Sequence, residues 1–573
     1  MLHAAALLLA LVLLALLAGP RTSISSDEGA AIHQAVLLQR GGWLVEPTLP
    51  ELDPGLVQQP FLLADAGEKG RAPYAKHPAY PLLLERAIGA WGRQGLVVPG
   101  VLGVWAAAVA AALLAGALRA TATIPTLWLL GLGSPLTVDA QLVLAHAPAA
   151  GTAAVAALAA GLVLAPAAFG RLGARGWVPP AATAVAMLAA AATVALRTEG
   201  ALLVGGLVVG AVLSGSAWRR SIGLAAGLLA AAVGARAVEV AVVRSVVGAA
   251  APAPAPPSSS NGFLAARAQA FQTSWLDVGH AARPGAALLG MAALALLGAV
   301  VGSRWQARTG VVTGLIGLAL GSASGWLLLG DVGMVPGLLP ATPWLVAGVA
   351  STRRSGLRPG LSRFLAVASV ASAGAILATQ YSFGGGVEWG GRFYAVVLPL
   401  ASPVAVAALW PDSPGWWRTP VAPPVMAAVG LTALVSVGGL LAIRSGHDSA
   451  ASVGRELARA AAASPPGRPG DPDHRAVVVG PQRLWPQLLW PHLDEHRWVT
   501  AERDHLPCTL FGLREAGFDS LVLLGPRVDD LVSLAEPQGW RAAPGPPGRF
   551  TRLVQARVPA PATTPACPPD LGR

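Results

Sequence analysis

The sequence predicts a mainly α-helical membrane protein, a polytopic bundle of transmembrane helices followed by a small α/β domain. Hydrophobic residues make up 54% of the 573 residues, only 12% are charged, and the mean hydropathy is +0.58. Long apolar runs alternate with short arginine clusters over residues 1–443, and the composition becomes mixed after that point. Because about a quarter of the residues of a soluble protein are charged, these values place the chain in the membrane class.

The apolar runs predict about thirteen spans. A helix needs about 20 apolar residues to cross roughly 30 Å of hydrocarbon. The first run lacks the basic region of a signal peptide, so we expect an uncleaved helix there. The runs lie at 2–19, 96–118, 121–134, 141–165, 178–196, 200–215, 221–243, 285–302, 309–329, 334–350, 363–380, 393–410 and 421–443.

The arginines of the short loops predict the orientation, because positive residues concentrate in cytoplasmic loops. With a cytoplasmic N-terminus, the short outer loops hold two arginines, Arg197 and Arg392, and the inner loops hold twelve. The long segments 20–95, 244–284 and 444–573 are then exoplasmic. The inner arginines are Arg119, Arg171, Arg175, Arg219, Arg220, Arg304, Arg308, Arg353, Arg354, Arg358, Arg363 and Arg418.

The net charge of +11 comes from 40 Lys+Arg against 29 Asp+Glu. These charges lie in short clusters between apolar runs rather than on one face or tail, so they indicate topology and not a nucleic-acid partner. Two cysteines, Cys508 and Cys567, are too few for a disulfide framework or a zinc site. A single disulfide between them is the alternative to two free thiols.

Acidic residues near the membrane gather on the predicted outer face, which indicates an active face. The same outer loops also contain two arginines and a tryptophan. The set is Asp27, Glu28, Asp139, Glu199 and Glu388, with Arg197, Arg392 and Trp389.

Several of these residues have a structural alternative. Ser25, Ser26 or Asp27 can cap a helix over residues 29–40, with Glu28 in its first turn, and Asp139 can cap the fourth span. For Asp27 we favour a functional role, which is compatible with capping.

Ionisable residues at membrane depth are costly and usually functional. The tight turn between two spans pins Arg197 and Glu199 there. Arg236 and Glu239, spaced i and i+3 in the seventh span, can instead neutralise one another as a structural pair.

The loop 20–95 is too long for a simple connector. It ends in "KHPAYP", in which two prolines stiffen the backbone beside Lys76, His77 and Tyr80. A rigid basic and aromatic stretch at headgroup level suits an anionic lipid headgroup. An interfacial anchor is the alternative for Tyr80.

These features together resemble the GT-C superfamily of membrane glycosyltransferases. The shared features are a first helix, an outward Asp27-Glu28 pair, a long outer loop ending in the Lys76 stretch, and many further spans. The similarity is greatest to the aminoarabinose and protein-mannosyl transferase branch and covers about the first two hundred residues. His77 stands where the family has its first proline. Because Asp139 has no tandem aspartate, a tightly held metal is not implied, and a divalent cation stays open.

The resemblance implies transfer of a sugar from a polyprenyl-phosphate carrier to an exoplasmic acceptor hydroxyl, typically with inversion. The acceptor is a glycan, a lipid or a protein, and the location is the cell membrane, here the bacterial plasma membrane. A carboxylate can take the proton of the attacking hydroxyl, and we assign this role to Asp27, with Glu28 beside it. Substrate-binding candidates are Lys76, His77, Asp139, Arg197, Glu199, Glu388, Trp389 and Arg392.

The last 130 or so residues predict a small exoplasmic α/β domain over 444–558. Short apolar strings at 476–480, 497–501, 520–525 and 549–558 alternate with helix-like stretches. The Pro-rich tail 559–573 is expected to be disordered.

A polytopic transporter, a lipid flippase and a noncatalytic membrane scaffold are the alternative functions. Transporters tend to show repeated halves and broken helices at the midplane. The sequence shows no internal repeat, and its candidate charges lie at one face. In an enzyme, these charges should line one outward cavity.

Overall fold

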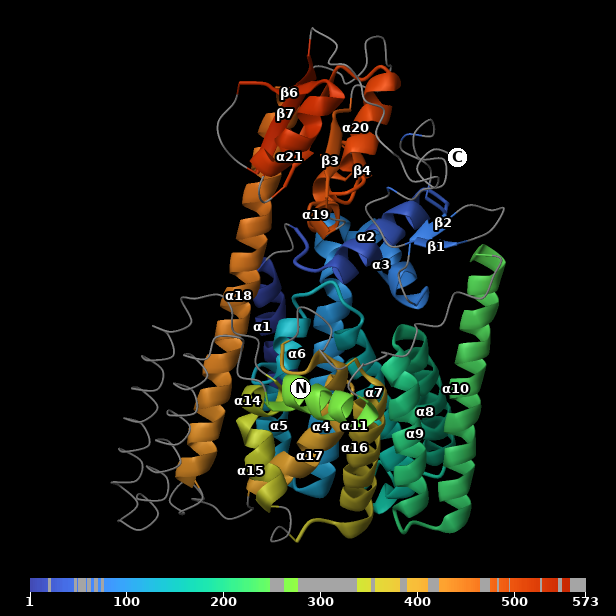
Figure 1. Ribbon diagram of the computed structural model, residues 1–573. Coiled ribbons are helices and arrows are strands. Elements are labelled where there is room, and N and C mark those ends of the chain that lie inside the picture. The colour runs from blue at the N-terminus through green and yellow to red at the C-terminus, as the bar shows by residue number, and fades with distance from the viewer. Residues whose placement is uncertain are drawn as a thin grey trace. The chain divides into compact units, whose positions relative to one another are not determined.

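The computed structural model describes most of the chain (Figure 1). The described residues are 1–18, 22–45, 49, 58, 63–65, 71–73, 77–247, 262–276, 337–351, 356–381, 389–410, 422–463, 475–481, 484–493, 495–525, 528–544 and 549–556.

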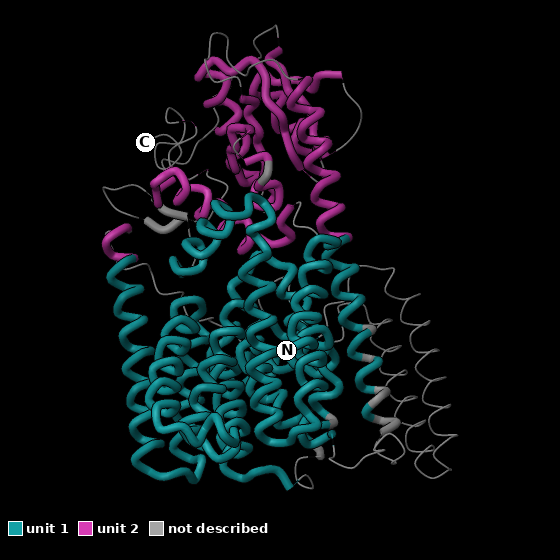
Figure 2. Tube along the Cα trace, turned by 180° about the vertical axis from the view of Figure 1, so that it is seen from behind, with its two compact units in different colours: residues 1–20, 77–242, 253–444 teal, residues 21–76, 243–252, 445–573 magenta. Residues whose placement is uncertain are grey.

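The chain forms two compact units (Figure 2). The first contains residues 1–20, 77–242 and 253–444, and the second contains residues 21–76, 243–252 and 445–573. Most of the first long loop is therefore grouped with the C-terminal residues. The sequence pattern, which assigns this loop to the transmembrane part, does not reveal this grouping.

The first unit is a helix bundle. In the part of the chain that the structure describes, six helices are long and apolar enough to cross a membrane: α4, α7, α8, α10, α16 and α18. The helices of the bundle are α1 (Leu2–Ala18), α3 (Ala79–Trp91), α4 (Val98–Leu118), α5 (Thr123–Gly131), α6 (Pro135–Asp139), α7 (His146–Leu164), α8 (Val178–Leu196), α9 (Thr198–Leu213), α10 (Trp218–Val247), α11 (Phe263–Phe271), α14 (Leu338–Ala341), α15 (Pro343–Ser351), α16 (Pro359–Thr379), α17 (Leu398–Leu409) and the first part of α18 (Ala422–Ala462).

Small residues allow the helices of the bundle to pack closely. Helix α4 packs on α7, and a Cβ added at Gly151 would lie 2.6 Å from the carbonyl oxygen of Gly103. Helix α9 packs on α16, and a Cβ at Gly206 would lie 2.7 Å from the carbonyl oxygen of Ala368. Apolar burial between helices drives little association in lipid, so such backbone contacts carry much of the packing.

Several predicted spans differ from the observed helices. The run 421–443 continues as α18 to Ala462. The run 121–134 begins in a 3-10 turn (Ala120–Ala122) and forms α5, whose 9 residues measure about 14 Å, because Gly131, Gly133 and Pro135 end the helix. The run 141–165 is helical only from His146, so Asp139 does not cap this span.

The predicted runs 285–302 and 309–329 lie outside the described residues, and the run 334–350 falls in part on α14 and α15.

The second unit contains a five-stranded mixed sheet in the order β4-β3-β5-β7-β6. Strand β3 pairs in parallel with β4 and β5, and β7 pairs antiparallel with β5 and β6. Four strands coincide with the predicted apolar strings, whereas β6 has only 3 residues and no recognisable alternation. The strands are β3 (Val477–Gly480), β4 (Arg497–Thr500), β5 (Ser520–Leu524), β6 (Trp540–Ala542) and β7 (Phe550–Gln555).

Helices α20 (Leu506–Glu515) and α21 (Val528–Ala535) contribute apolar residues to the core of this domain. The buried Trp540 donates its ring N–H to the carbonyl of Leu510 at 3.0 Å. Leu49, from the first loop, is buried in the same core.

The first loop forms further contacts with this domain. The backbone carbonyl of Gln58 accepts from the backbone N–H of Thr500 at 2.7 Å. The side-chain amide of Gln58 donates to the Thr509 hydroxyl at 3.0 Å. The loop also forms helix α2 (Ser26–Gln39) and an antiparallel hairpin of β1 (Leu63–Asp65) and β2 (Arg71–Pro73). These contacts explain why the loop belongs to the second unit.

The stability of the α/β domain is predicted to depend on the protonation of His496. Burial lowers the pKa of this imidazole below its ordinary value, Glu495 opposes the shift, and His492 adds to it. The unfolded chain then binds the proton at higher pH than the folded domain, so folding stability is present above about pH 6.5 and is lost as the pH falls through the lower, folded pKa. We expect amide exchange in β3 and β4, corrected for intrinsic rates, to accelerate over this range.

The His496→Gln variant is the control, because its amide does not titrate. Its exchange should depend less on pH than that of the wild type. Identical pH profiles for the two proteins would contradict the prediction.

Candidate functional site

The predicted Asp27-Glu28 pair lies in the first turn of α2, within the second unit. Ser25 caps this helix and Glu28 completes a capping box. The Glu28 carboxylate is fully buried and accepts from the backbone N–H groups of Ile24 and Ser25 at 2.9 and 3.0 Å, and from the Ser25 hydroxyl at 3.1 Å. Asp27 is half-buried. The two neighbouring carboxylates therefore have different surroundings.

Residues before and in α2 are held by the C-terminal part of the same unit. The Ser23 hydroxyl donates to the carbonyl of Gln487 in α19 (Leu484–Leu488) at 2.6 Å. The Thr22 hydroxyl donates to the carbonyl of His447 at 3.3 Å. A Cβ at Gly29 would meet the Gln487 backbone, so α2 lies closely against this segment. The position of Asp27 thus depends on residues more than four hundred positions away in the chain.

The role of Glu28 can be separated into cap and charge. Glu28→Ala removes the acceptor of three hydrogen bonds and should lower the free energy of unfolding of this unit by about 1–3 kcal/mol. Glu28→Gln keeps an acceptor oxygen at the same position and should retain most of this stability. Hydrogen exchange of the α2 amides in both variants measures the difference, and equal protection would show that the capping box contributes little.

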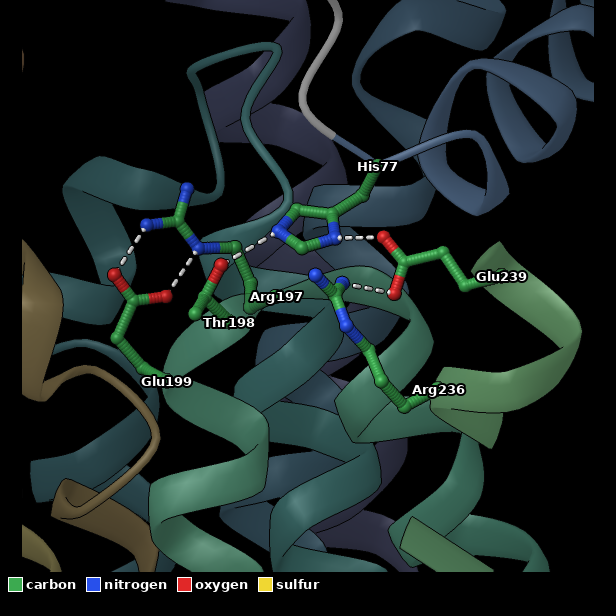
Figure 3. Close-up of polar contacts among 6 residues, drawn as sticks. All are labelled: His77, Arg197, Thr198, Glu199, Arg236 and Glu239. Atoms are coloured by element: carbon green, nitrogen blue, oxygen red, sulfur yellow. Dashed lines mark hydrogen bonds and ion pairs between the residues drawn. The ribbon is translucent and has the colours of Figure 1, made fainter. Parts of the chain in front are cut away.

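A polar network in the first unit joins three segments that are far apart in the chain (Figure 3). His77 lies just before α3, and Nδ1 of its ring is 2.8 Å from Oε1 of Glu239 in α10. Its Nε2 is 2.9 Å from the hydroxyl of Thr198 at the start of α9. The second oxygen of Glu239 accepts from Arg236 at 2.6 Å. We call these four residues the His77 network.

Arg197 and Glu199 flank Thr198 and form a bidentate ion pair. The Nε and Nη2 groups of Arg197 donate to the two oxygens of Glu199 at 2.9 and 2.8 Å. Both side chains are mostly buried. The two residues that the sequence places in the turn between two spans therefore pair with each other, and Figure 3 shows them beside the His77 network.

Asp139, Trp389 and Arg392 are also buried in the first unit, at 1%, 7% and 4% exposure. Their segments pack together. A Cβ at Gly390 would meet the ring of Pro135 in α6, and a Cβ at Gly439 would lie 2.6 Å from both Trp389 and Val138.

The Arg392 guanidinium lies 5.7 Å from the ring centroid of Phe393, which is itself 6.4 Å from the ring of His146. Asp139 and the pair Trp389 and Arg392, which the sequence places in two separate outer loops, therefore lie on segments that contact each other. Lys76 and Glu388, the remaining candidates, lie outside the described residues.

Three polar residues at these positions were not predicted from the sequence. Thr198 joins the His77 network. Gln141, in the turn between α6 and α7, and His146, the first residue of α7, are each buried at 2% exposure. The position of Thr198 between two candidates was the available signal. Gln141 and His146 lie inside the run 141–165, which the sequence predicts as a membrane span, so nothing in the sequence marked them as candidates.

Among the described residues, no group of three or more His, Cys, Asp or Glu side chains could hold a metal ion. The His77 network brings only one histidine and one carboxylate together. The contacts that His77 and Glu239 make are hydrogen bonds and ion pairs with other residues of the protein.

Solved structures provide a match for the fold. The chain is similar to ArnT from Cupriavidus metallidurans bound to undecaprenyl phosphate, with a TM-score of 0.53 and 13% identity, over 96% of this chain and 98% of that chain. ArnT from the same organism in the apo state gives a TM-score of 0.42 and 14% identity, over 96% and 97%.

AglB, the archaeal oligosaccharyltransferase from Archaeoglobus fulgidus in complex with an inhibitory peptide and a dolichol-phosphate, gives a TM-score of 0.44 and 11% identity, over 93% of this chain and 71% of that chain. No family model and no curated protein matches the sequence. The likeness to the first ArnT structure, at 13% identity, shows that the chain shares the fold of that protein.

Proposed function

We propose that the protein is a membrane glycosyltransferase that moves a sugar from a polyprenyl-phosphate carrier to an acceptor hydroxyl on the exoplasmic side. The observation that carries this proposal is the fold likeness over nearly the whole chain to ArnT, which was solved with undecaprenyl phosphate bound. The apolar helices of the first unit suit a carrier dissolved in the bilayer.

In this proposal Asp27 is the general base. A hydroxyl is a weak nucleophile, and a carboxylate within hydrogen-bond reach can take its proton during attack on the anomeric carbon. Glu28 is buried in the capping box, which leaves Asp27 as the better candidate of the pair. Its helix contacts the segment of Gln487, so we assign acceptor binding to the C-terminal domain.

The leaving phosphate requires cations in fixed positions, because charge develops on it as the sugar departs. Arg197, Arg392 and Lys76 are the proposed cations. Glu199, Glu388, Asp139 and Trp389 are proposed to bind the sugar, the carboxylates by its hydroxyls and the indole by stacking. The proposal assigns no residue as a metal ligand. A divalent cation as cofactor is compatible with it.

We place the reaction in the bacterial plasma membrane with the N-terminus cytoplasmic, since the arginine count of the short loops favours this orientation. Asp27 and the C-terminal domain then face outward, where lipid-linked rather than nucleotide-linked sugars serve as donors. An accessibility assay with single cysteines at position 27 and in the loop of Arg304 tests the orientation.

An assay of the purified protein in liposomes tests the function. It offers a panel of polyprenyl-phosphate sugars with glycan, lipid and peptide acceptors and measures both the transferred sugar and the released polyprenyl phosphate. We expect equal amounts of the two products for one donor. Movement of an unchanged lipid between leaflets, without cleavage of any donor in the panel, would contradict the proposal and favour a flippase.

A further inference from the structure

His77 makes contacts through both of its ring nitrogens. One nitrogen contacts Glu239 on α10, the other contacts Thr198 on α9, and the side chain is buried at 7% exposure. The residue itself belongs to the segment that enters α3. One imidazole thus connects three elements of the first unit, as Figure 3 shows.

The donors and acceptors of this chain of contacts can be assigned. A carboxylate only accepts, so Nδ1 of His77 carries a proton and donates to Glu239. When the ring is neutral, Nε2 accepts from the Thr198 hydroxyl, and when the ring is protonated it donates to the same oxygen. A hydroxyl can serve either role, so the link to α9 persists in both charge states.

Thr198 is the residue between Arg197 and Glu199, so the link holds the turn that carries this ion pair. An arginine guanidinium has five N–H donors, and Glu199 accepts from two of those of Arg197. The Nη1 group has no partner within the described residues and lies on the edge of the guanidinium that Glu199 does not contact. Such an edge matches a phosphate group, which accepts from guanidinium in a planar, bidentate manner.

We infer that His77 is a positioning residue, which acts through Thr198 to hold the unoccupied edge of Arg197 toward the phosphate of the lipid donor. This inference rests on the proposed function for the identity of the donor. It differs from the expectation that His77 binds substrate itself, because both ring nitrogens are already used within the protein.

The test compares substitutions of Thr198, which change the link with little change in volume. Thr198→Val removes the hydroxyl, and Thr198→Ser keeps it. We expect Thr198→Val and His77→Ala to raise the KM for the donor about tenfold, the size of a lost hydrogen bond to a charged network, with kcat and the acceptor KM unchanged. Thr198→Ser should restore a donor KM near that of the wild type.

Thr183→Val is the matched control. Its hydroxyl donates to the carbonyl of Pro179 within α8 at 2.9 Å, outside the His77 network, so its donor KM should equal the wild-type value. A purely structural role of the link would change kcat and the acceptor KM as much as the donor KM. That result, or an unchanged donor KM in Thr198→Val, would overturn the inference.

A double-variant experiment tests whether the effect passes through Arg197. In an Arg197→Ala background, Thr198→Val should raise the donor KM no further, because the group that the link positions is gone. A second full tenfold increase in that background would overturn the inference.

Binding of undecaprenyl phosphate alone separates this inference from the proposed function. If the wild type binds this lipid but transfers no sugar, the proposed function fails while the inference is judged by affinity. A Kd about tenfold weaker in Thr198→Val supports the positioning role, and an equal Kd contradicts it.

Discussion

Asp27→Asn is expected to lower kcat for sugar transfer by about 10²–10⁴-fold, because the amide cannot take the proton of the acceptor hydroxyl. The substitution keeps the volume of the side chain, and the capping box of α2 uses Ser25 and Glu28 instead. Expression, membrane insertion and the donor KM should therefore stay near their wild-type values. Single-turnover transfer in liposomes measures the loss directly.

Asp530→Asn provides the matched control. Asp530 is also a half-buried aspartate in the first turn of a helix, α21, in the same unit. Its amide variant should transfer sugar at the wild-type rate. Wild-type turnover by Asp27→Asn would remove Asp27 as the base, and an equal loss in both variants would point to a general effect on the unit.

Gly206→Leu is expected to prevent the bundle from folding correctly. A Cβ at Gly206 meets the Ser372 hydroxyl and would lie 2.7 Å from the Ala368 carbonyl oxygen, so a larger side chain forces α9 away from α16. Overpacking typically costs about 1–3 kcal/mol and occasionally more, and we expect the upper end here because the opposing backbone atoms cannot move aside. We expect a lower midpoint of thermal unfolding and little monodisperse protein in detergent.

The neighbouring glycine of the same helix provides the control for this change. A Cβ at Gly205 has nothing within 4 Å among the described residues. Gly205→Leu should therefore be neutral or slightly stabilising, since leucine is a better helix former than glycine, which costs about 0.8–1 kcal/mol relative to alanine. Equal yields of the two variants would mean that the close approach of α9 and α16 is not required.

Hydropathy was sufficient to predict a membrane protein, because a bilayer imposes length and apolarity on each span separately. Strands β3, β4, β5 and β7 were also predictable, since each is a short apolar string between turns. Helix α5 was predicted too long because apolar residues continue past Gly131. Hydropathy counts those residues, whereas glycine and proline end the helix.

The sequence points to candidate residues for the site but not to the contacts among them. Local sequence marked Asp27, Glu28, Arg197 and Glu199 as candidates, but the bidentate pair of Arg197 and Glu199 is seen only in the structure. The link from His77 to Thr198 and Glu239 spans more than a hundred residues. No local pattern encodes it, since it arises from the packing of separate helices.

The sequence by itself predicted a multi-pass membrane protein with a C-terminal α/β domain, because each of those features depends on composition within short windows. Only the tertiary structure decided that the first loop belongs to the same compact unit as that domain and that Glu28 is buried in a helix cap while Asp27 is not. It also decided that His77 is held by two helices. The physical reason is that hydrogen bonds and burial between distant segments form only when the whole chain packs, and a window of sequence contains only one partner of each contact.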